Sequence, residues 1–183
     1  MRRVIVQVSL SLDGFVAPAP GAEDHRGHED PVLKQAKLEL LKNTGTHVMG
    51  RVTYEEMAQH WPTSTDEYAP PMNDLPKVVF SKTLESAAWE HSRVARCELA
   101  TEIATLREEP GGDIIAWGGA SFLQALSRAG LVDEYRLVIT PVALGDGLPL
   151  FKDLASPLRL GLAEATTYQD GSALHVYRPA LTA

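Results

Sequence analysis

Apolar runs and amphipathic stretches take turns along the chain, and this alternation predicts the order of its strands and helices. Short runs rich in β-branched residues predict strands, whereas apolar residues that recur three or four positions apart predict helices. The predicted strands are 4–10, 46–49, 77–80, 89–95, 113–117 and 134–143. The predicted helices are 31–45, 50–59, 98–109 and 120–129, the first with Asp30 as its N-cap and Pro31 at its first position. Such an alternation is typical of α/β proteins.

The last part of the chain follows a different pattern. Two alternating runs, 158–168 and 173–178, succeed each other without a helix, and Asp170-Gly171 between them is a strong β-hairpin signal. No repeat or linker divides the chain. We therefore predict one α/β domain, residues 1–183, whose mixed sheet ends in an antiparallel hairpin. Proline, glycine and polar residues mark the predicted loops, which are 18–29, 60–75 and 145–151.

Composition narrows the class of protein. The 183 residues are 44% hydrophobic and 22% charged, which is typical of a soluble domain with a full core. The net charge of −7 argues against nucleic acid or an anionic membrane as the main partner. The chain shows no signal-peptide pattern and no apolar run long enough to cross a membrane. Cys97 stands alone, so no internal disulfide can form. We expect a cytoplasmic protein.

The sharpest local signal is Gly118-Gly119, which lies between a predicted strand and a predicted helix. Glycines let a ligand approach the backbone closely, and the N-terminus of a helix offers unpaired N–H groups to a phosphate. The alternative is a tight connection that binds nothing. Segments 50–53 and 81–83 also follow predicted strands, and ligands of open α/β sheets lie beyond the carboxyl ends of the strands.

These three segments together predict a site for a phosphorylated nucleotide. Arg51 is suited to grip an additional phosphate through a bidentate contact, and Lys82 adds a second positive charge. Each segment also has a simpler interpretation. Arg51 is then a solvated residue at the start of a helix, and Ser81-Lys82-Thr83 is a polar turn.

Few residues are candidates for other chemistry. Asp13 is the first candidate for a polar catalytic role, and a simple Asp-Gly turn is the alternative. Trp61 and Trp117 are candidates to stack on a flat substrate, unless they are core aromatics. His25 and His28 have no cysteine nearby, so we expect no metal site. No grouping of serine or cysteine with histidine indicates a hydrolase.

Several motifs resemble a known family. Residues 48–55, Val-Met-Gly-Arg-Val-Thr-Tyr-Glu, resemble the strand-to-helix signature of dihydrofolate reductases. Four further motifs resemble the reductase domain of the bifunctional riboflavin-biosynthesis deaminase-reductase, in the same order and at compatible spacings. They are Ser-Leu-Ser-Leu-Asp-Gly-Phe-Val-Ala at 9–17, Trp-Gly-Gly-Ala-Ser-Phe at 117–122, Gly-Leu-Val-Asp-Glu at 130–134 and Gly-Asp-Gly-Leu-Pro-Leu-Phe at 145–151.

This resemblance implies a dihydrofolate-reductase-like, three-layer α/β/α sandwich that binds NADPH as a homodimer. It also implies a cis peptide bond between Gly118 and Gly119. The implied activity is hydride transfer from NADPH to a small heterocycle. By position, the residues implied to contact the cofactor are Val16 and Ala17 beside the nicotinamide, Gly50, Arg51, Val52 and Thr53 on the adenosine side, Ser81, Lys82 and Thr83 near the adenine ribose, and Gly118, Gly119, Ala120, Ser121 and Phe122 at the pyrophosphate.

Two departures from dihydrofolate reductases argue against folate as the substrate. Lys34 lies near the place of the acidic residue that protonates the pterin, and no arginine occurs between His60 and Lys77 to grip the folate tail. A reductase of a pterin, pyrimidine or flavin-like heterocycle fits better. The alternatives are a protein that binds NADPH or a heterocycle without turnover, and a divergent dihydrofolate reductase in which Glu29 or Asp30 supplies the acid.

Overall fold

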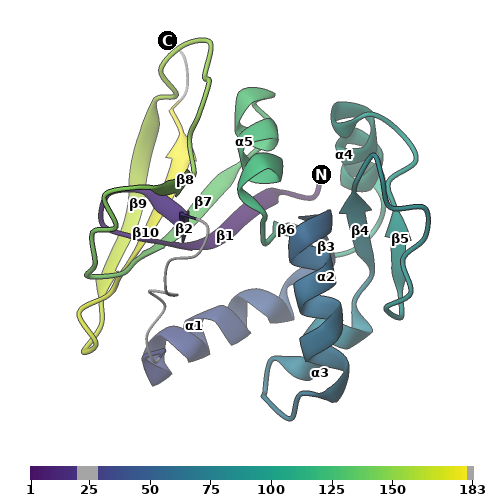
Figure 1. Ribbon diagram of the computed structural model, residues 1–183, viewed down its shortest axis with the longest axis horizontal. Coiled ribbons are helices and arrows are strands. Elements are labelled where there is room, and N and C mark those ends of the chain that lie inside the picture. Colours follow the sequence, from purple (N-terminus) through teal and green to yellow (C-terminus); the bar gives the residue numbers. More distant parts are fainter. Residues whose placement is uncertain (20–28, 181–183) are drawn as a thin grey trace.

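The centre of the molecule is an eight-stranded sheet that runs across Figure 1 from β5 on the right to β9 on the left. The computed structural model describes residues 1–19 and 29–180. The order across the sheet is β5-β4-β3-β6-β1-β7-β10-β9, in which all pairs as far as β1-β7 are parallel and the last two are antiparallel. The strands of this sheet are β1 (Val4–Leu10), β3 (Thr44–Gly50), β4 (Lys77–Phe80), β5 (Ser92–Val94), β6 (Asp113–Ala116), β7 (Glu134–Ile139), β9 (Leu160–Thr167) and β10 (Ala173–Pro179).

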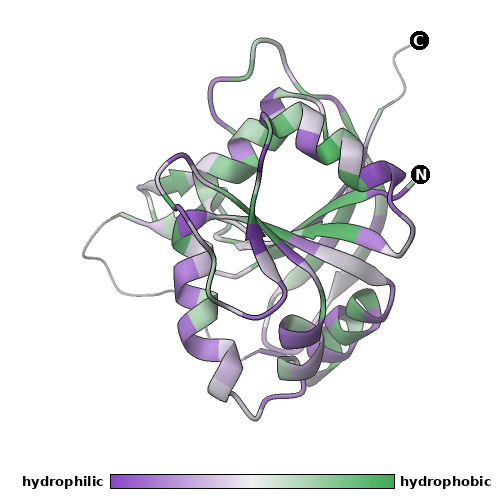
Figure 2. Cartoon of the chain, turned by 90° about the vertical axis from the view of Figure 1, so that its right-hand side faces the viewer, coloured by the Kyte–Doolittle hydropathy of each residue, from purple (hydrophilic) through white to green (hydrophobic). Residues whose placement is uncertain are grey.

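Helices cover both faces of the sheet and make the three layers that the resemblance implies. In Figure 1, α4 and α5 lie above the strands, and α1 and α3 lie below them. Several central strands between the two helix layers are strongly hydrophobic (Figure 2). None of the described helices is long and apolar enough to span a bilayer. The helices are α1 (Pro31–Lys42), α2 (Arg51–His60), the 3₁₀ turn η1 (Trp61–Thr63), α3 (Ala69–Asp74), α4 (Leu99–Glu108) and α5 (Ala120–Arg128).

Two apolar clusters explain why the central strands are hydrophobic throughout. Strands that are buried on both faces lack the alternation of half-exposed strands. On one face, Val48 and Ile114 pack with Leu123 of α5 in the main core. On the other face, Met49 packs with Tyr54 of α2 and with residues of α1 and α3. β3 therefore supplies residues to both layers, and so does β4 through Val78 and Val79.

Asp30 caps α1 as the sequence predicts. Its Oδ1 accepts a hydrogen bond from the Val32 N–H at 2.7 Å, and its Oδ2 accepts one from the Gln169 N–H at 3.0 Å. The second bond ties the start of α1 to the β9–β10 turn. The helix itself ends earlier than predicted, at Lys42 instead of near Gly45, because β3 already begins at Thr44.

Two predicted loops contain regular structure. Segment 60–75 holds η1 and α3, which the prolines obscure in the sequence, although proline is well tolerated in the first turn of a helix. Segment 145–151 contains β8 (Gly147–Pro149), which pairs with β2 (Phe15–Pro18) in a separate two-stranded sheet. Three or four residues carry too short a pattern to be recognised as a strand.

Two strands are shorter than predicted. The predicted strand 134–143 ends at Ile139, where β10 stops pairing with it. The predicted strand 89–95 is reduced to β5 at the short edge of the sheet. The predicted hairpin of β9 and β10 and the mixed character of the sheet are confirmed.

The amino ends of the strands carry buried charges whose partners lie within the protein. The Lys77 ammonium donates to the carbonyl oxygens of Asn73, Leu75 and Glu90, at 2.7, 2.7 and 3.1 Å. Burial lowers the pKa of Lys77 to about 8. Glu134, which is 3% exposed, forms ion pairs with three arginines. These arginines are Arg3, Arg136 and Arg178. At this end of the strands, called the amino edge, Lys77 and Glu134 are thus partnered within the protein, whereas Ser92 Oγ and Arg136 Nε are buried without a hydrogen-bond partner among the described residues.

Candidate functional site

The carboxyl ends of β4, β3 and β6 lie side by side. We call this end of the strands the carboxyl edge. The strands are parallel neighbours, and the Gly50 N–H donates to the Gly118 carbonyl at 2.7 Å, which joins the ends of β3 and β6. Phe80, the last residue of β4, stacks on Phe122 of α5 with ring centroids 4.9 Å apart. The structure thus brings together the three segments from which the sequence predicts a nucleotide site.

Close packing requires glycine where β6 meets α5. Gly118 has φ of +152°, and a Cβ there would lie 2.9 Å from the hydroxyl oxygen of Thr53. A Cβ on Gly50 would lie 3.2 Å from the Cβ of Phe122. The Gly118–Gly119 peptide bond is cis, as the resemblance implies. The start of α2 therefore packs directly against the glycine pair.

Two helices begin at this edge without a side-chain cap. The N-cap of α2 is Gly50 and that of α5 is Gly119, and neither N-terminus receives a hydrogen bond from a side chain of its cap residue. The first N–H groups of any helix have no acceptor within the helix, and the helix dipole adds a partial positive charge there. By contrast, Asp30 caps α1 with its own carboxylate. The paired, uncapped starts of α2 and α5 are suited to an anion.

The two cations near this edge differ in their surroundings. Arg51 forms an ion pair with Glu55 one turn along α2, with N···O of 2.8 Å, and both side chains are 43% exposed. Such an exposed pair contributes little to stability, so its loss to a ligand costs little. Lys82 is exposed, and none of the ion pairs formed by residues 1–19 and 29–180 includes it.

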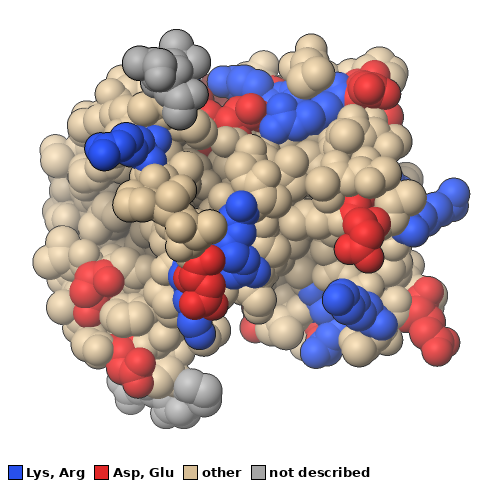
Figure 3. Space-filling view, turned by 90° about the horizontal axis from the view of Figure 1, so that it is seen from above, with Lys and Arg blue, Asp and Glu red and all other residues tan. Residues whose placement is uncertain are grey.

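Ser81 and Thr83 form a turn after β4. The Ser81 hydroxyl accepts hydrogen bonds from the N–H groups of Thr83 and Leu84, at 3.1 and 3.0 Å. This is the polar turn that the sequence offers as the simpler interpretation, and it holds Lys82 at the tip. Figure 3 shows both acidic and basic side chains on the face seen from above.

The Asp13 carboxylate accepts three hydrogen bonds, which stabilise its ionised form. It accepts from the Ser11 hydroxyl at 2.6 Å and from the N–H groups of Leu144 and Gly145 at 3.1 and 2.7 Å. These bonds, led by that of Ser11, lower the pKa of Asp13 to about 2. An ionised carboxylate that accepts at both oxygens ties the loop after β1 to the loop before β8. This geometry favours the turn interpretation of Asp13 over an acid role.

The segment with Val16 and Ala17 pairs with β8 beside the carboxyl edge. Ala17 pairs with Leu148, and a Cβ on Gly147 would lie 2.4 Å from the Ala17 carbonyl oxygen. Val16 packs against the main core. The Leu150 N–H donates to the Gly14 carbonyl at 3.1 Å. Residues 14–18 therefore have a fixed backbone position.

Trp117 lies immediately before the glycine pair and is oriented by a buried histidine. Its indole N–H donates to Nδ1 of His47 at 2.9 Å, and Nε2 of His47 lies 3.0 Å from the Pro71 carbonyl oxygen. His47 is fully buried, and burial lowers its pKa to about 4. The sequence motifs locate Trp117 beside the glycine pair but give no role to His47. A histidine inside an apolar strand, two residues before Met49, is the available signal.

Trp61 lies elsewhere. It follows the last residue of α2, about 15 Å along the helix from Arg51. Its ring contacts the edges of His60 and Tyr68, with centroids 4.6 and 6.2 Å apart. The structure thus does not group Trp61 with the glycine pair.

The two carboxylates considered as alternative acids are both engaged. Glu29 accepts from the Tyr68 hydroxyl at 2.9 Å and forms an ion pair with Lys37. Asp30 caps α1. Lys34 pairs with two acidic residues of the segment before α3, Asp66 and Glu67. His25 and His28 lie outside the described residues, and no group of three potential metal ligands occurs within 1–19 and 29–180.

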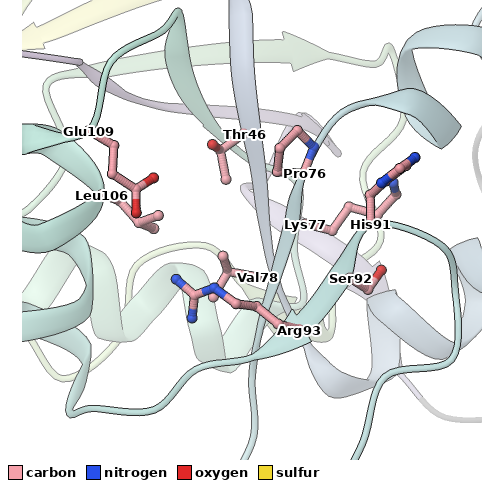
Figure 4. A pocket seen from close by; sticks show the side chains of 9 residues that line it. All are labelled: Thr46, Pro76, Lys77, Val78, His91, Ser92, Arg93, Leu106 and Glu109. Atoms are coloured by element: carbon pink, nitrogen blue, oxygen red, sulfur yellow. The ribbon is translucent and has the colours of Figure 1, made fainter.

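A recess of about 260 Å³ lies at the opposite edge of the sheet (Figure 4). Its lining includes Thr46, Lys77 and Glu109 at the amino ends of the strands. Arg2 fills part of this region by donating to the Thr46 hydroxyl and pairing with Glu109. The recess therefore lies at the amino edge and is remote from the glycine pair.

Comparison with known proteins agrees with the motifs. The family model of the RibD C-terminal domain matches residues 2–174. The uncharacterized protein YyaP of Bacillus subtilis (strain 168) is 30% identical over 184 aligned positions, which cover 96% of this chain and 94% of YyaP. The uncharacterized protein YwjB of the same strain is 26% identical, over 97% of this chain and 98% of YwjB.

Solved structures share the fold. A protein of Shewanella sp. PV-4 attributed to riboflavin biosynthesis aligns with a TM-score of 0.80 and 23% identity, over 98% of this chain and 99% of that one. The diaminohydroxyphosphoribosylaminopyrimidine deaminase/5-amino-6-(5-phosphoribosylamino)uracil reductase of Thermotoga maritima aligns with a TM-score of 0.69 and 16% identity, over 98% of this chain and 57% of that one. The predicted resemblance and fold class are confirmed.

Proposed function

The chain belongs to the family of the RibD C-terminal domain, and on that premise we propose that it is a reductase that uses NADPH to reduce a small heterocyclic substrate. The family supports an oxidoreductase of the riboflavin-biosynthesis-reductase type. The cofactor and the substrate class are our proposal. The observation that carries the cofactor assignment is the pair of uncapped helix starts beside Gly118-Gly119.

The chemistry of this edge fits a phosphorylated dinucleotide. The N–H groups at the start of α5, in segment 119–121, are suited to a pyrophosphate, which is an anion that accepts several hydrogen bonds. Arg51 Nη1 donates to both carboxylate oxygens of Glu55, and the guanidinium can exchange this exposed partner for a phosphate on the adenine ribose, which it can bind with two parallel hydrogen bonds. Ser81, Lys82 and Thr83 lie at the end of the adjacent strand and would flank that ribose.

The remaining residues orient the reactants. NADPH, when bound, supplies the hydride. Val16 and Ala17 would support the nicotinamide, since β8 fixes the backbone of their strand. Asp13 would act as a positioning residue that holds this strap closed, because its carboxylate already accepts from Leu144 and Gly145. Hydride transfer depends mainly on such alignment.

The proposed substrate is a flat heterocycle of the pyrimidine, pterin or flavin type. The Thermotoga maritima relative is named for a uracil derivative, and we extend that chemical class to this chain as a proposal. Lys34 is already paired with Asp66 and Glu67, and the absence of arginine between 60 and 77 removes the grip that folate needs. Both features favour a substrate other than dihydrofolate.

A non-catalytic binding protein is the second candidate, and one observation favours it. Asp13, Glu29 and Asp30 all have hydrogen-bond donors or cations as partners, so none of these three carboxylates is a free acid. Steady-state oxidation of NADPH with a panel of pterins, ribosylaminouracils and flavins separates the two. We expect turnover with at least one substrate and weaker use of NADH. NADPH binding without turnover across the panel would support the binding protein. No NADPH binding would refute the reductase and leave only a protein that binds a heterocycle.

A further inference from the structure

The indole of Trp117 has its only polar atom occupied inside the protein. The N–H donates to His47 Nδ1 at 2.9 Å, and the two rings are tilted by 52° with centroids 5.9 Å apart. Trp117 as a whole residue is half-buried. An indole has no hydrogen-bond acceptor and one donor. What Trp117 still offers to a ligand is therefore an apolar aromatic surface.

The hydrogen bonds around His47 fix a single neutral form of the imidazole. The Pro71 carbonyl accepts but cannot donate, so Nε2 of His47 carries the proton. The indole donates but cannot accept, so Nδ1 of His47 carries the lone pair. The nearby Lys77 ammonium and the complete burial of the ring oppose a second proton. His47 thus connects α3 on one side with Trp117 on the other.

Trp117 is also fixed through its backbone. Its N–H donates to the Val48 carbonyl at 3.2 Å, and the following residue, Gly118, accepts from Gly50. The indole packs against the cluster that contains Met49 and Tyr54. Backbone and side chain are therefore both held, directly beside the paired starts of α2 and α5.

We propose that His47 is a positioning residue that holds Trp117 as a stacking surface for the flat ring of the substrate. Recognition at this wall depends on ring overlap and not on a hydrogen bond from the indole. This inference rests on the proposed function and deepens it, because it specifies a substrate with an aromatic ring system and names the residue that binds this ring. A pre-oriented indole loses little entropy on binding, which favours affinity.

The test is a titration of the full-length protein with lumazine, a flat pteridinedione, in the presence of saturating NADPH. Stacking on an indole is worth enough that Trp117→Leu should weaken lumazine about tenfold, whereas Trp117→Phe should weaken it about threefold. His47→Phe leaves the indole N–H without an acceptor and should weaken lumazine about fivefold. His47→Gln, whose amide can both donate and accept, should restore affinity to within about twofold.

Trp89 supplies the matched control. Its indole N–H also donates to a side chain, Asn73 Oδ1, at the same distance of 2.9 Å, and it belongs to the same apolar cluster. Trp89→Phe should leave the lumazine affinity unchanged whatever its effect on stability. A ¹H–¹⁵N spectrum of the indole groups adds a second readout. His47→Phe should move only the Trp117 resonance, and His47→Gln should return it toward the wild-type position.

The outcomes separate this inference from the proposed function. Equal lumazine affinity in wild type and Trp117→Leu, or no lumazine binding by wild type, would overturn the stacking role while leaving NADPH binding intact. An unmoved Trp117 resonance in His47→Phe would overturn the positioning role of His47. Failure of wild type to bind NADPH, with lumazine binding that still depends on Trp117, would refute the proposed reductase and retain the stacking wall.

Discussion

The amino edge and the carboxyl edge of the sheet differ in how their polar groups are satisfied. At the amino edge, Lys77 and Glu134 are buried and surrounded by partners from the protein itself. At the carboxyl edge, the starts of α2 and α5 lack side-chain caps and the nearby charged side chains are exposed. Buried polar groups must be satisfied internally, whereas open N–H groups are satisfied by solvent or by a ligand. The comparison separates an edge that stabilises the fold from an edge suited to binding.

Two lysines test this separation most strongly. Lys77→Met removes the donor from three carbonyls and should lower the free energy of unfolding by about 3–5 kcal/mol, with unchanged NADPH affinity. The matched variant Lys82→Met, at the carboxyl edge, should leave stability unchanged and weaken NADPH. Urea unfolding and a fluorescence titration measure the two quantities. A loss of NADPH affinity in Lys77→Met, in protein that is still folded, would contradict the separation of a stabilising edge from a binding edge.

Low pH should lower the stability of the protein through His47, which is buried in its neutral form. The pKa of His47 is about 4 in the folded protein and 6.5 for the free side chain. Below pH 6.5 the unfolded chain therefore binds more protons than the folded protein does. Stability is fully present above pH 6.5 and falls as the pH drops toward 4. Between pH 7 and pH 4.5 this group should account for about 2–3 kcal/mol of lost stability. His47→Gln should lack that part of the loss, as measured by urea unfolding at both pH values.

Arg51 probes the binding edge directly. Arg51→Ala should weaken NADPH by about 1.5–3 kcal/mol, the scale of a hydrogen bond to a charged group, and NADH much less. The matched variant Glu55→Gln releases Arg51 from its partner and should leave NADPH binding equal or slightly tighter. Calorimetric titration with both coenzymes measures the difference. Equal losses for NADPH and NADH in Arg51→Ala would remove the extra phosphate from the assignment.

Asp13 should give the smallest effect. Asp13→Asn keeps one acceptor oxygen and loses the other, so the strap between Ser11 and Gly145 loosens. We expect kcat to fall about tenfold, well short of the 10²–10⁴-fold range of a general acid, with no shift in the pH profile near neutrality. Full loss of activity together with a shifted acid limb would instead identify Asp13 as the proton donor.

Sequence patterns predict the framework because its elements have local signals. Continuous apolar runs locate the central strands, Asp30-Pro31 locates the start of α1, and Asp170-Gly171 locates the final hairpin. The same holds for the convergence of Gly50 with Gly118, since parallel order places their strand ends together. These features depend on neighbours in the sequence or on a general property of parallel sheets.

Features that depend on distant partners escape such prediction. The role of His47 requires knowing that Trp117 and Pro71, far apart in sequence, meet on either side of its ring. The bonds from Leu144 and Gly145 that occupy Asp13 also come from a remote loop. A local pattern contains no information about these contacts. Hydrogen bonds lower the pKa of Asp13, whereas burial lowers the pKa of His47.

Hydrogen exchange with and without NADPH tests the central claim most directly. Bound coenzyme should slow amide exchange at the starts of α2 and α5, in segments 51–53 and 119–121, because their N–H groups acquire acceptors. The amino edge around Lys77 and Glu134 should show no such local change. Protection confined to the amino edge, or no protection anywhere at saturating NADPH, would contradict the assignment of the carboxyl edge as the nucleotide site.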